Sequence, residues 1–244
     1  METESGTQTM GKKGLSRDAV KLIAVFAMTL NHAARAFPMS RLAEMIMTDI
    51  GYYTAVTMCF FLVEGFCYTR SYRKYALRLL AFAVIAQWPY MQICGKTANM
   101  LFTLLACLCI LIVQEQVQQN TQRNVLTMLL VISTVISDWG VLAPLFTLMF
   151  YRARGDRQKE KKAYLIAFGA FFIAEYLTFI PEEGALAGAL QALCASVPIL
   201  LSGLTTLYLY NGKRSERGKT FFKWFFYVYY PAHLLVLAFI SHIV

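Results

Sequence analysis

The chain has 244 residues, of which 58% are hydrophobic and 15% charged, and its mean hydropathy is +0.50. Soluble domains carry about 45–50% apolar and about 25% charged residues. The apolar residues also occur in blocks of about 15 to 25, roughly the length that a helix needs to cross a bilayer. These figures argue against a soluble enzyme, a nucleic-acid-binding domain and a disordered chain, and they predict an all-α, polytopic membrane protein.

The net charge is +9, from 23 Lys and Arg against 14 Asp and Glu. Most basic residues lie in short clusters between apolar blocks, where membrane topology and anionic headgroups account for them. We therefore expect a lipid bilayer as the surroundings and no nucleic-acid partner. The six cysteines form no C-x-x-C pair, which favours small buried side chains over a disulfide framework or a metal site.

The chain divides into a polar start and a long apolar remainder. The polar residues 1–17 predict a flexible cytoplasmic tail, and residues 18–244 predict a single transmembrane domain. Ser16 or Asp18 is available to cap the first helix. Nine apolar segments predict about nine transmembrane helices, at residues 18–37, 50–69, 76–93, 98–114, 124–138, 139–152, 163–181, 186–210 and 220–242. The segment 139–152 is short and contains Pro144, so whether it crosses the membrane is left open.

The basic residues predict the orientation of these segments. If the amino terminus is cytoplasmic and the segments alternate, all Lys and Arg fall on the inner side except Arg35, Arg41 and Lys96. Since cytoplasmic loops are enriched in Lys and Arg, we expect the amino terminus inside and the carboxyl terminus outside.

Ionisable residues inside membrane segments are costly and mark candidate functional sites. Lys21 and His32 are eleven residues apart, so they lie on nearly one helix face, roughly 16 Å apart along the axis. A cation at the cytoplasmic end can hold phosphates, and a deeper imidazole can act as a general base. The extended arm of coenzyme A would bridge this separation. The alternative is that Lys21 extends to the headgroups and His32 bonds to a neighbouring helix.

Further candidates lie near the cytoplasmic side. Glu64 is at about the depth of Lys21, which predicts a buried ion pair between them, either for binding or purely architectural. Arg70, Arg73 and Lys74 follow on the same side, where they either set the topology or bind a donor phosphate.

A second group lies near the outer ends of the segments. Asn99 is a candidate oxyanion donor, and Asp138 a candidate to orient the imidazole or receive an acceptor amine, unless it belongs to a plain turn. Arg35 and Glu175 are candidate acceptor-binding residues, with Glu175 matching no motif. In the aromatic last segment Tyr230 and His233 are candidates for substrate binding, and His233 is also the second choice as base; packing is the alternative for both.

Seven segments carry a family resemblance, in consistent order from residue 15 to 235. They are LSRDAVKLI (15–23), NHAARAF (31–37), FLVEGFCYTR (61–70), KYALRLL (74–80), NMLFTLL (99–105), DWG (138–140) and YYPAHLL (229–235). Together they resemble the TraX family, whose namesake is the F-pilin acetylase of conjugation systems. The Lys21-x10-His32 spacing also resembles the Arg/Lys-x10-His signature of acyltransferase-three membrane enzymes. Asn31 and Trp139 depart from the family pattern, where Asp and Tyr are more usual.

The resemblance implies an acetyltransferase of the cytoplasmic (inner) membrane. Acetyl-CoA would supply the acetyl group, no metal would be needed, and His32 would act as general base or as a transient acetyl carrier. The acceptor, an amine or hydroxyl on the outer side, is left open among a peptide, a pilin, a glycan and a small amine. The residues alone also leave open a small transporter and a non-catalytic assembly protein for conjugation or secretion.

Overall fold

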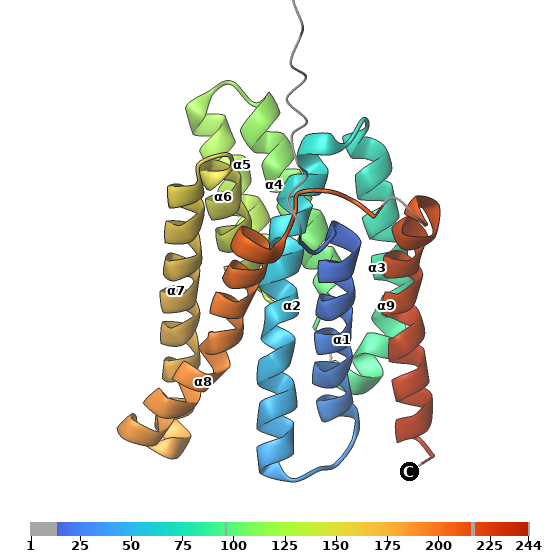
Figure 1. Cartoon of the computed structure of the whole chain (residues 1–244), viewed down its shortest axis with the longest axis vertical. Helices are drawn as coiled ribbons and strands as arrows, with labels where there is room; N and C mark the ends of the chain where they lie inside the picture. Colours follow the sequence, from blue (N-terminus) through green and yellow to red (C-terminus); the bar gives the residue numbers. More distant parts are fainter. Residues whose placement is uncertain (1–13, 96, 216–217, 244) are drawn as a thin grey trace, which may run out of the picture.

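The computed structural model describes residues 14–95, 97–215 and 218–243, and its regular structure within these ranges is helical (Figure 1). Most of the predicted tail lies outside the described residues. The described helices are α1 (Arg17–Ala36), α2 (Arg41–Tyr68), α3 (Tyr72–Cys94), α4 (Met100–Gln116), α5 (Asn120–Ser133), α6 (Leu142–Ala153), α7 (Arg157–Glu183), α8 (Ala185–Leu204), which continues into the π-helical turn η1 (Thr205–Leu209), and α9 (Lys219–Ser241).

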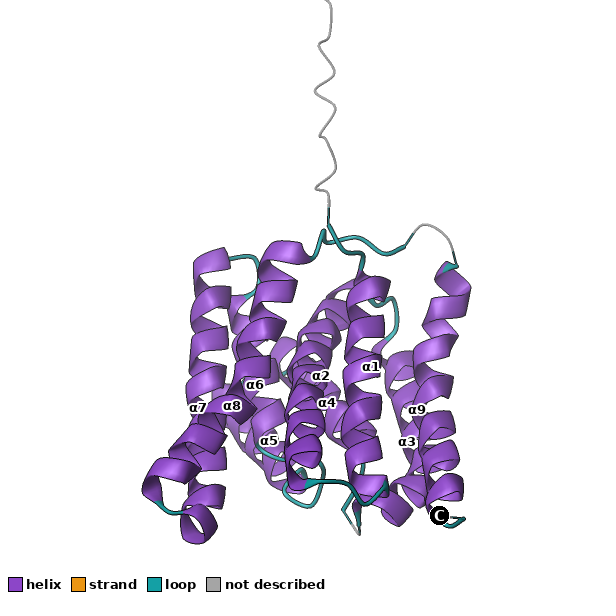
Figure 2. Ribbon diagram, turned by 60° about the horizontal axis from the view of Figure 1, so that its bottom comes forward, coloured by secondary structure: helices purple, strands orange, loops and turns teal. Residues whose placement is uncertain are grey.

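The helices form one bundle in which consecutive helices run in opposite directions (Figures 1 and 2). The connections at 69–71, 117–119, 154–156 and 210–215 therefore lie at the same end as the start of α1. We call this the basic end, because Arg70, Arg154, Lys213 and Arg214 belong to or adjoin these connections. The fold brings the predicted inner loops together, while the direction in which the bundle crosses the membrane stays a prediction.

Five of the described helical segments are long and apolar enough to cross a membrane: α2, α3, α7, α8 with η1, and α9. Two apolar helices are shorter, α4 with 17 residues and α6 with 12. At about 1.5 Å per residue α6 is about 18 Å long, less than the roughly 30 Å of a hydrocarbon core. The structure thus supports a helical membrane protein with five candidate spans among its described helices, and a crossing by all nine predicted segments stays a prediction. The predicted segment 139–152 becomes a non-helical stretch followed by α6.

Two sets of hydrogen bonds hold the start of α1 in place. The Ser16 side chain accepts a hydrogen bond from the Ala19 amide at 3.2 Å, so the predicted Ser16 cap is confirmed. Just before it, Leu15 pairs with the connection between α8 and α9: its amide donates to the Leu209 carbonyl at 2.8 Å, and its carbonyl accepts from the Asn211 amide at 3.0 Å. These bonds hold the α8–α9 connection across the start of α1.

Helix α2 is central to the packing. It packs against α1, α4, α6 and α8, while α3 packs against α9 and α1 against both α3 and α9. The main core lies on the α6–α8 side of α2 and includes Leu108, Phe146 and Phe171, which are almost wholly buried. The cavity described below lies on the side made by α1, α3 and α9. All six cysteines are free thiols.

The close packing of α7 on α8 depends on a glycine. A Cβ at Gly203 would lie 2.9 Å from Cγ of Tyr164, a buried ring whose hydroxyl lies 2.7 Å from Thr206 Oγ1. Because that ring is held, we expect Gly203→Ala to lower the free energy of unfolding by about 1–3 kcal/mol. Denaturant unfolding in detergent measures this change.

The matched control is Gly169→Ala in α7, where nothing lies within 4 Å of the added carbon. Since alanine favours a helix over glycine, this variant should be as stable as the wild type or up to about 1 kcal/mol more stable. Equal stability of the two variants would contradict the close approach at Gly203.

Candidate active site

A cavity of about 610 Å³ lies between α1, α2, α3, α4 and α9. This volume is within the roughly 300–1,000 Å³ of small-molecule sites. Lys21 and His32 both line it, as their spacing on one face of α1 predicts. The ionisable residues that line it, tyrosines aside, are Arg17, Asp18, Lys21, His32, Arg35, Glu64, Arg78, Asp138, Arg214 and Lys223.

The cavity has two chemically different ends. One adjoins the basic end of the bundle and is lined by Arg17, Lys21, Arg78, Arg214 and Lys223; we call it the cationic end. The other, the histidine end, is lined by His32, Arg35, Asp138, Trp139 and Tyr230.

The predicted Lys21–Glu64 ion pair is replaced by another pair. Glu64 Oε2 lies 3.8 Å from Arg17 Nη1, and Glu64 Oε1 accepts a hydrogen bond from the Tyr210 hydroxyl. Arg17 lies one helical turn before Lys21, closer to the end of the bundle where Glu64 and the α8–α9 connection meet. Glu64 therefore ties α1, α2 and this connection together.

Lys21 is held by aromatic rings instead of a carboxylate. Its Nζ lies 5.4 Å from the centroid of the Phe61 ring and 5.4 Å from that of Phe226. A cation over ring faces is stabilised without losing its charge. The Lys21 ammonium thus remains available to an anion in the cavity.

Two arginine side chains at the cationic end have unused donors. The Nε atoms of Arg17 and Arg78 are buried and make no hydrogen bond within the described residues. Buried N–H groups are normally satisfied, so each unsatisfied one calls for a partner. The nearby acids are Glu64, which is paired, and Asp18, which accepts a hydrogen bond from the Ser215 amide at 2.9 Å. The cationic end therefore has an excess of positive charge and is suited to an anion.

Three of the residues predicted to bind the donor phosphates lie outside the cavity. Arg70, Arg73 and Lys74 are exposed and do not line the cavity. Arg78, one helical turn further along α3, takes their place. Arg70 lies in the connection before α3, and the first turn of α3 points Arg73 and Lys74 outward, so the basic cluster at 70–74 fits the topology alternative.

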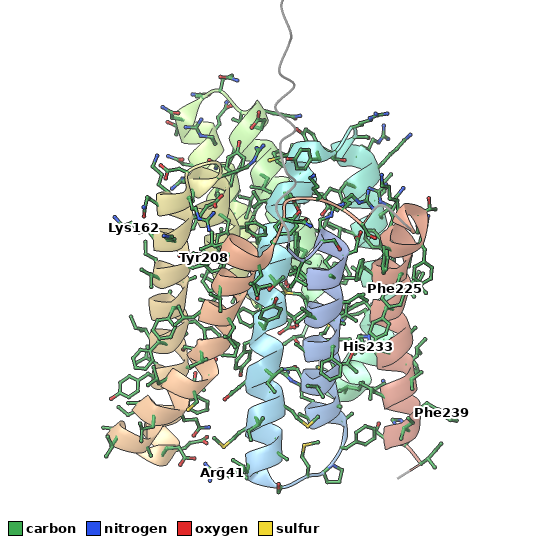
Figure 3. All side chains as sticks on the ribbon, in the orientation of Figure 1. Arg41, Lys162, Tyr208, Phe225, His233 and Phe239 are labelled. Atoms are coloured by element: carbon green, nitrogen blue, oxygen red, sulfur yellow. The ribbon has the colours of Figure 1, made fainter. Side chains whose placement is uncertain are left out.

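At the histidine end two imidazoles meet. His32 Nδ1 lies 2.7 Å from His233 Nε2, and the rings are stacked with centroids 5.0 Å apart. His233 lies on α9 and the bond connects it to α1 (Figure 3). Both side chains are buried, at 5% and 7% exposure. His233 does not line the cavity, so its predicted direct contact with substrate is replaced by contact with His32.

Asp138 and Trp139 reach the cavity from the connection between α5 and α6. The Asp138 amide donates to the Ala98 carbonyl at 2.8 Å, and its carbonyl accepts from Thr103 Oγ1 at 2.6 Å. The Trp139 ring stacks on Phe171 with centroids 5.1 Å apart. This fixed loop holds the Asp138 carboxylate close to Arg35 and Tyr90, with which it interacts electrostatically.

Two further predicted site residues, Asn99 and Glu175, also do not line the cavity. Asn99 caps α4 through Oδ1, which accepts from the Leu101 amide at 3.0 Å, and its Nδ2 donates to the Ala83 carbonyl at 2.8 Å and to Gln87 Oε1 at 2.9 Å. With its polar atoms engaged, Asn99 has no free donor for an oxyanion. Glu175 lies on α7, away from the cavity.

Sequence reasoning missed Arg17, Arg78, Tyr210, Arg214 and Lys223. Arg17 and Arg78 lie inside the segments that carry the family resemblance, which was a signal for them. Arg214 and Lys223 read as topology charges, because only the folding of the α8–α9 connection and the packing of α9 bring them to the cavity. Within the described residues no group of three or more His, Cys, Asp or Glu side chains is placed to hold a metal ion.

Comparison with known proteins decides the family. The model of the TraX protein family matches residues 16–241, a range that includes every residue lining the cavity. The chain belongs to the TraX family. It is also 31% identical over 233 residues to the probable fimbrial assembly protein FimC, serogroup H1, of Dichelobacter nodosus, which covers 89% of this chain and 92% of that protein. No solved structure matches this TraX-family chain.

The capping geometry of this TraX-family protein predicts a stability effect at Asn99. Removing the cap with Asn99→Ala should lower the free energy of unfolding by about 1–2 kcal/mol. Gln119→Ala is the control, because Gln119 precedes α5 without a side-chain capping bond. Unfolding in detergent measures both. An Asn99→Ala protein of wild-type stability that has lost catalysis would instead support the oxyanion role.

Proposed function

We propose that the protein is a membrane acyltransferase that moves an acetyl group from acetyl-CoA to an amine or hydroxyl acceptor. One observation carries the proposal: a single cavity connects the cationic end to His32. Lys21 and His32 lie roughly 16 Å apart along α1. A long donor with phosphates at one end and a thioester at the other matches this separation.

Donor binding follows from the lining. The phosphates bind at the cationic end, where Arg17 and Arg78 offer their unused Nε–H groups and Lys21 its ammonium. Charge-assisted hydrogen bonds of this kind are the stronger ones in proteins. The apolar middle of the cavity, which includes Val25, Met28 and Met58, takes the arm of the donor. The thioester then reaches the histidine end.

The chemical step uses His32 as general base. Its Nδ1 is engaged by His233, so Nε2 is the nitrogen that takes the proton from the acceptor N–H or O–H. The acceptor atom bonds to the thioester carbonyl carbon, the C–S bond breaks, and the departing thiolate takes the proton from His32. The same Nε2 is the atom that would carry the acetyl group in a two-step transfer.

Tyr230 replaces Asn99 as the candidate oxyanion donor. Its hydroxyl is buried, has no hydrogen-bond partner within the described chain, and belongs to a residue that lines the cavity beside His32. A donor held ready for developing charge is a large contribution to catalysis. Asp138 and Arg35 are the candidates to bind the acceptor, through an amine and a carboxylate respectively.

The name of the Dichelobacter nodosus relative, a probable fimbrial assembly protein, favours a fimbrial subunit as acceptor. A peptide, a glycan and a small amine are the other acceptor classes. The same name is equally compatible with a non-catalytic role in assembly, which requires no thioester chemistry. Catalysis therefore has to be tested directly.

The first test measures thiol release from acetyl-CoA by purified protein in detergent, with a short peptide that has a free amino terminus as acceptor. His32→Gln should lower kcat by about 10²–10⁴-fold, the usual contribution of a general base. Lys74→Ala, which changes an exposed residue outside the cavity, is the control and should leave the rate unchanged. Full activity of His32→Gln would sink the proposed mechanism.

The second test addresses the donor site. Arg78→Met should weaken acetyl-CoA binding by about 10-fold or more, because a lost charge-assisted bond costs about 1.5–3 kcal/mol. Arg73→Met removes the same charge from an exposed position of the same helix and should bind as the wild type does. Titration calorimetry with acetyl-CoA gives both affinities, and equal weakening of the two would argue for a diffuse electrostatic effect.

A further inference from the structure

We propose that His233 is a positioning residue that fixes which nitrogen of His32 carries the proton. It does so through a chain of two imidazoles that ends on the backbone carbonyl of Tyr229. The consequence for catalysis rests on the proposed function, whereas the protonation pattern itself follows from the hydrogen bonds alone.

The chain starts at the carbonyl. His233 Nδ1 lies 2.9 Å from the Tyr229 oxygen. A carbonyl oxygen only accepts hydrogen bonds, so the proton of this bond belongs to His233 Nδ1. A neutral imidazole has one N–H, and therefore His233 Nε2 is an acceptor.

The hydrogen bond between the two imidazoles then determines which nitrogen of His32 carries the proton. His233 Nε2 lies 2.7 Å from His32 Nδ1, and with His233 as acceptor the proton must come from His32. The single N–H of neutral His32 is thereby placed on Nδ1. Its Nε2 keeps a lone pair, and this atom has no hydrogen-bond partner within the described residues, on a side chain that lines the cavity. The base of the proposed reaction is thus aimed and deprotonated before substrate binds.

The surroundings hold this arrangement in place. Tyr90 and Tyr230 pack edge-on against the His32 ring, with centroids 6.3 and 6.1 Å away. Thr29 Oγ1 lies 2.9 Å from the Tyr229 hydroxyl and fastens α1 to α9 one turn away. The charged groups that line the cavity nearby are Arg35 and Asp138, and neither forms a hydrogen bond with the histidine pair.

In this protein a backbone carbonyl orients the imidazoles, as the aspartate carboxylate orients the histidine in a Ser-His-Asp catalytic triad. A neutral acceptor avoids the cost of burying a charge inside a membrane protein. When His32 Nε2 takes the proton of the acceptor, the positive charge on the His32 ring is stabilised by its Nδ1–H bond to neutral His233. No proton needs to move beyond His32, and the departing thiolate returns the ring to its starting state.

The protonation pattern is tested by nitrogen NMR of protein labelled with ¹⁵N-histidine. The chain has only three histidines, and His32→Gln and His233→Gln assign the two buried ones. The expected result is that both carry their proton on Nδ1 and have a bare Nε2, opposite to the preference of free imidazole side chains in water. A proton on His32 Nε2 overturns the proposal. This readout needs no turnover, so its failure is distinct from failure of the proposed function.

The consequence for catalysis is tested by replacing His233. His233→Leu removes the acceptor of the His32 proton and should lower kcat by about 10²-fold or more, while KM for acetyl-CoA stays within about 2-fold. At least one of His233→Gln and His233→Asn, whose amide oxygens accept a hydrogen bond, should recover most of kcat. Thr29→Val is the control, since it loosens α1 from α9 but keeps the imidazole chain, and it should retain wild-type kcat. A folded His233→Leu protein with wild-type kcat overturns the positioning role.

Discussion

The hydrogen bond between His32 and His233 connects α1 to α9, two helices that are 201 residues apart at these positions. Inside a membrane protein, water is not freely available to satisfy an imidazole, so buried nitrogens must find partners in the protein. This bond engages Nδ1 of His32 and Nε2 of His233. The Tyr229 carbonyl engages Nδ1 of His233, and Nε2 of His32 is left for the cavity. The shape of the cavity and the chemistry of its histidine end therefore depend on the same contact.

The charge distribution of the cavity is the second constraint. Charged groups inside a bundle are expensive and persist where they pair or serve a ligand. Glu64 pairs with Arg17, and Lys21 is held by aromatic faces, yet Arg17 and Arg78 still have unused N–H donors. The excess of cations at one end and the imidazole of His32 at the other make the two ends of the cavity chemically different. Under the proposed function, this difference sets the direction in which the anionic thioester binds.

Helical periodicity and residue type predicted those features of the fold and the site that depend on a single helix. The eleven-residue spacing placed Lys21 and His32 on one face, and both line the cavity; Ser16 caps α1 as its residue type suggested. The all-helical fold and the TraX family are likewise confirmed. The roles of residues that contact other helices were not predictable from the sequence. Asn99 is an α4 cap that also binds α3, and its neighbours lie 12 and 16 residues away in sequence.

The number of candidate membrane spans and part of the donor site could not be predicted for a related reason. Apolar side chains face lipid and protein core alike, so composition does not reveal that α6 has only 12 residues or which cations turn inward. Arg78 and Arg73 are both basic residues of α3, and only the rotation of the helix separates a cavity residue from an exposed one.

The most direct measurement is a structure of the protein with a non-hydrolysable thioether analogue of acetyl-CoA. The account predicts that the phosphates lie among Arg17, Lys21 and Arg78, and that the sulfur atom lies at the histidine end, beside Nε2 of His32. An analogue bound outside this cavity, or a cavity occupied by lipid in saturating analogue, would contradict it.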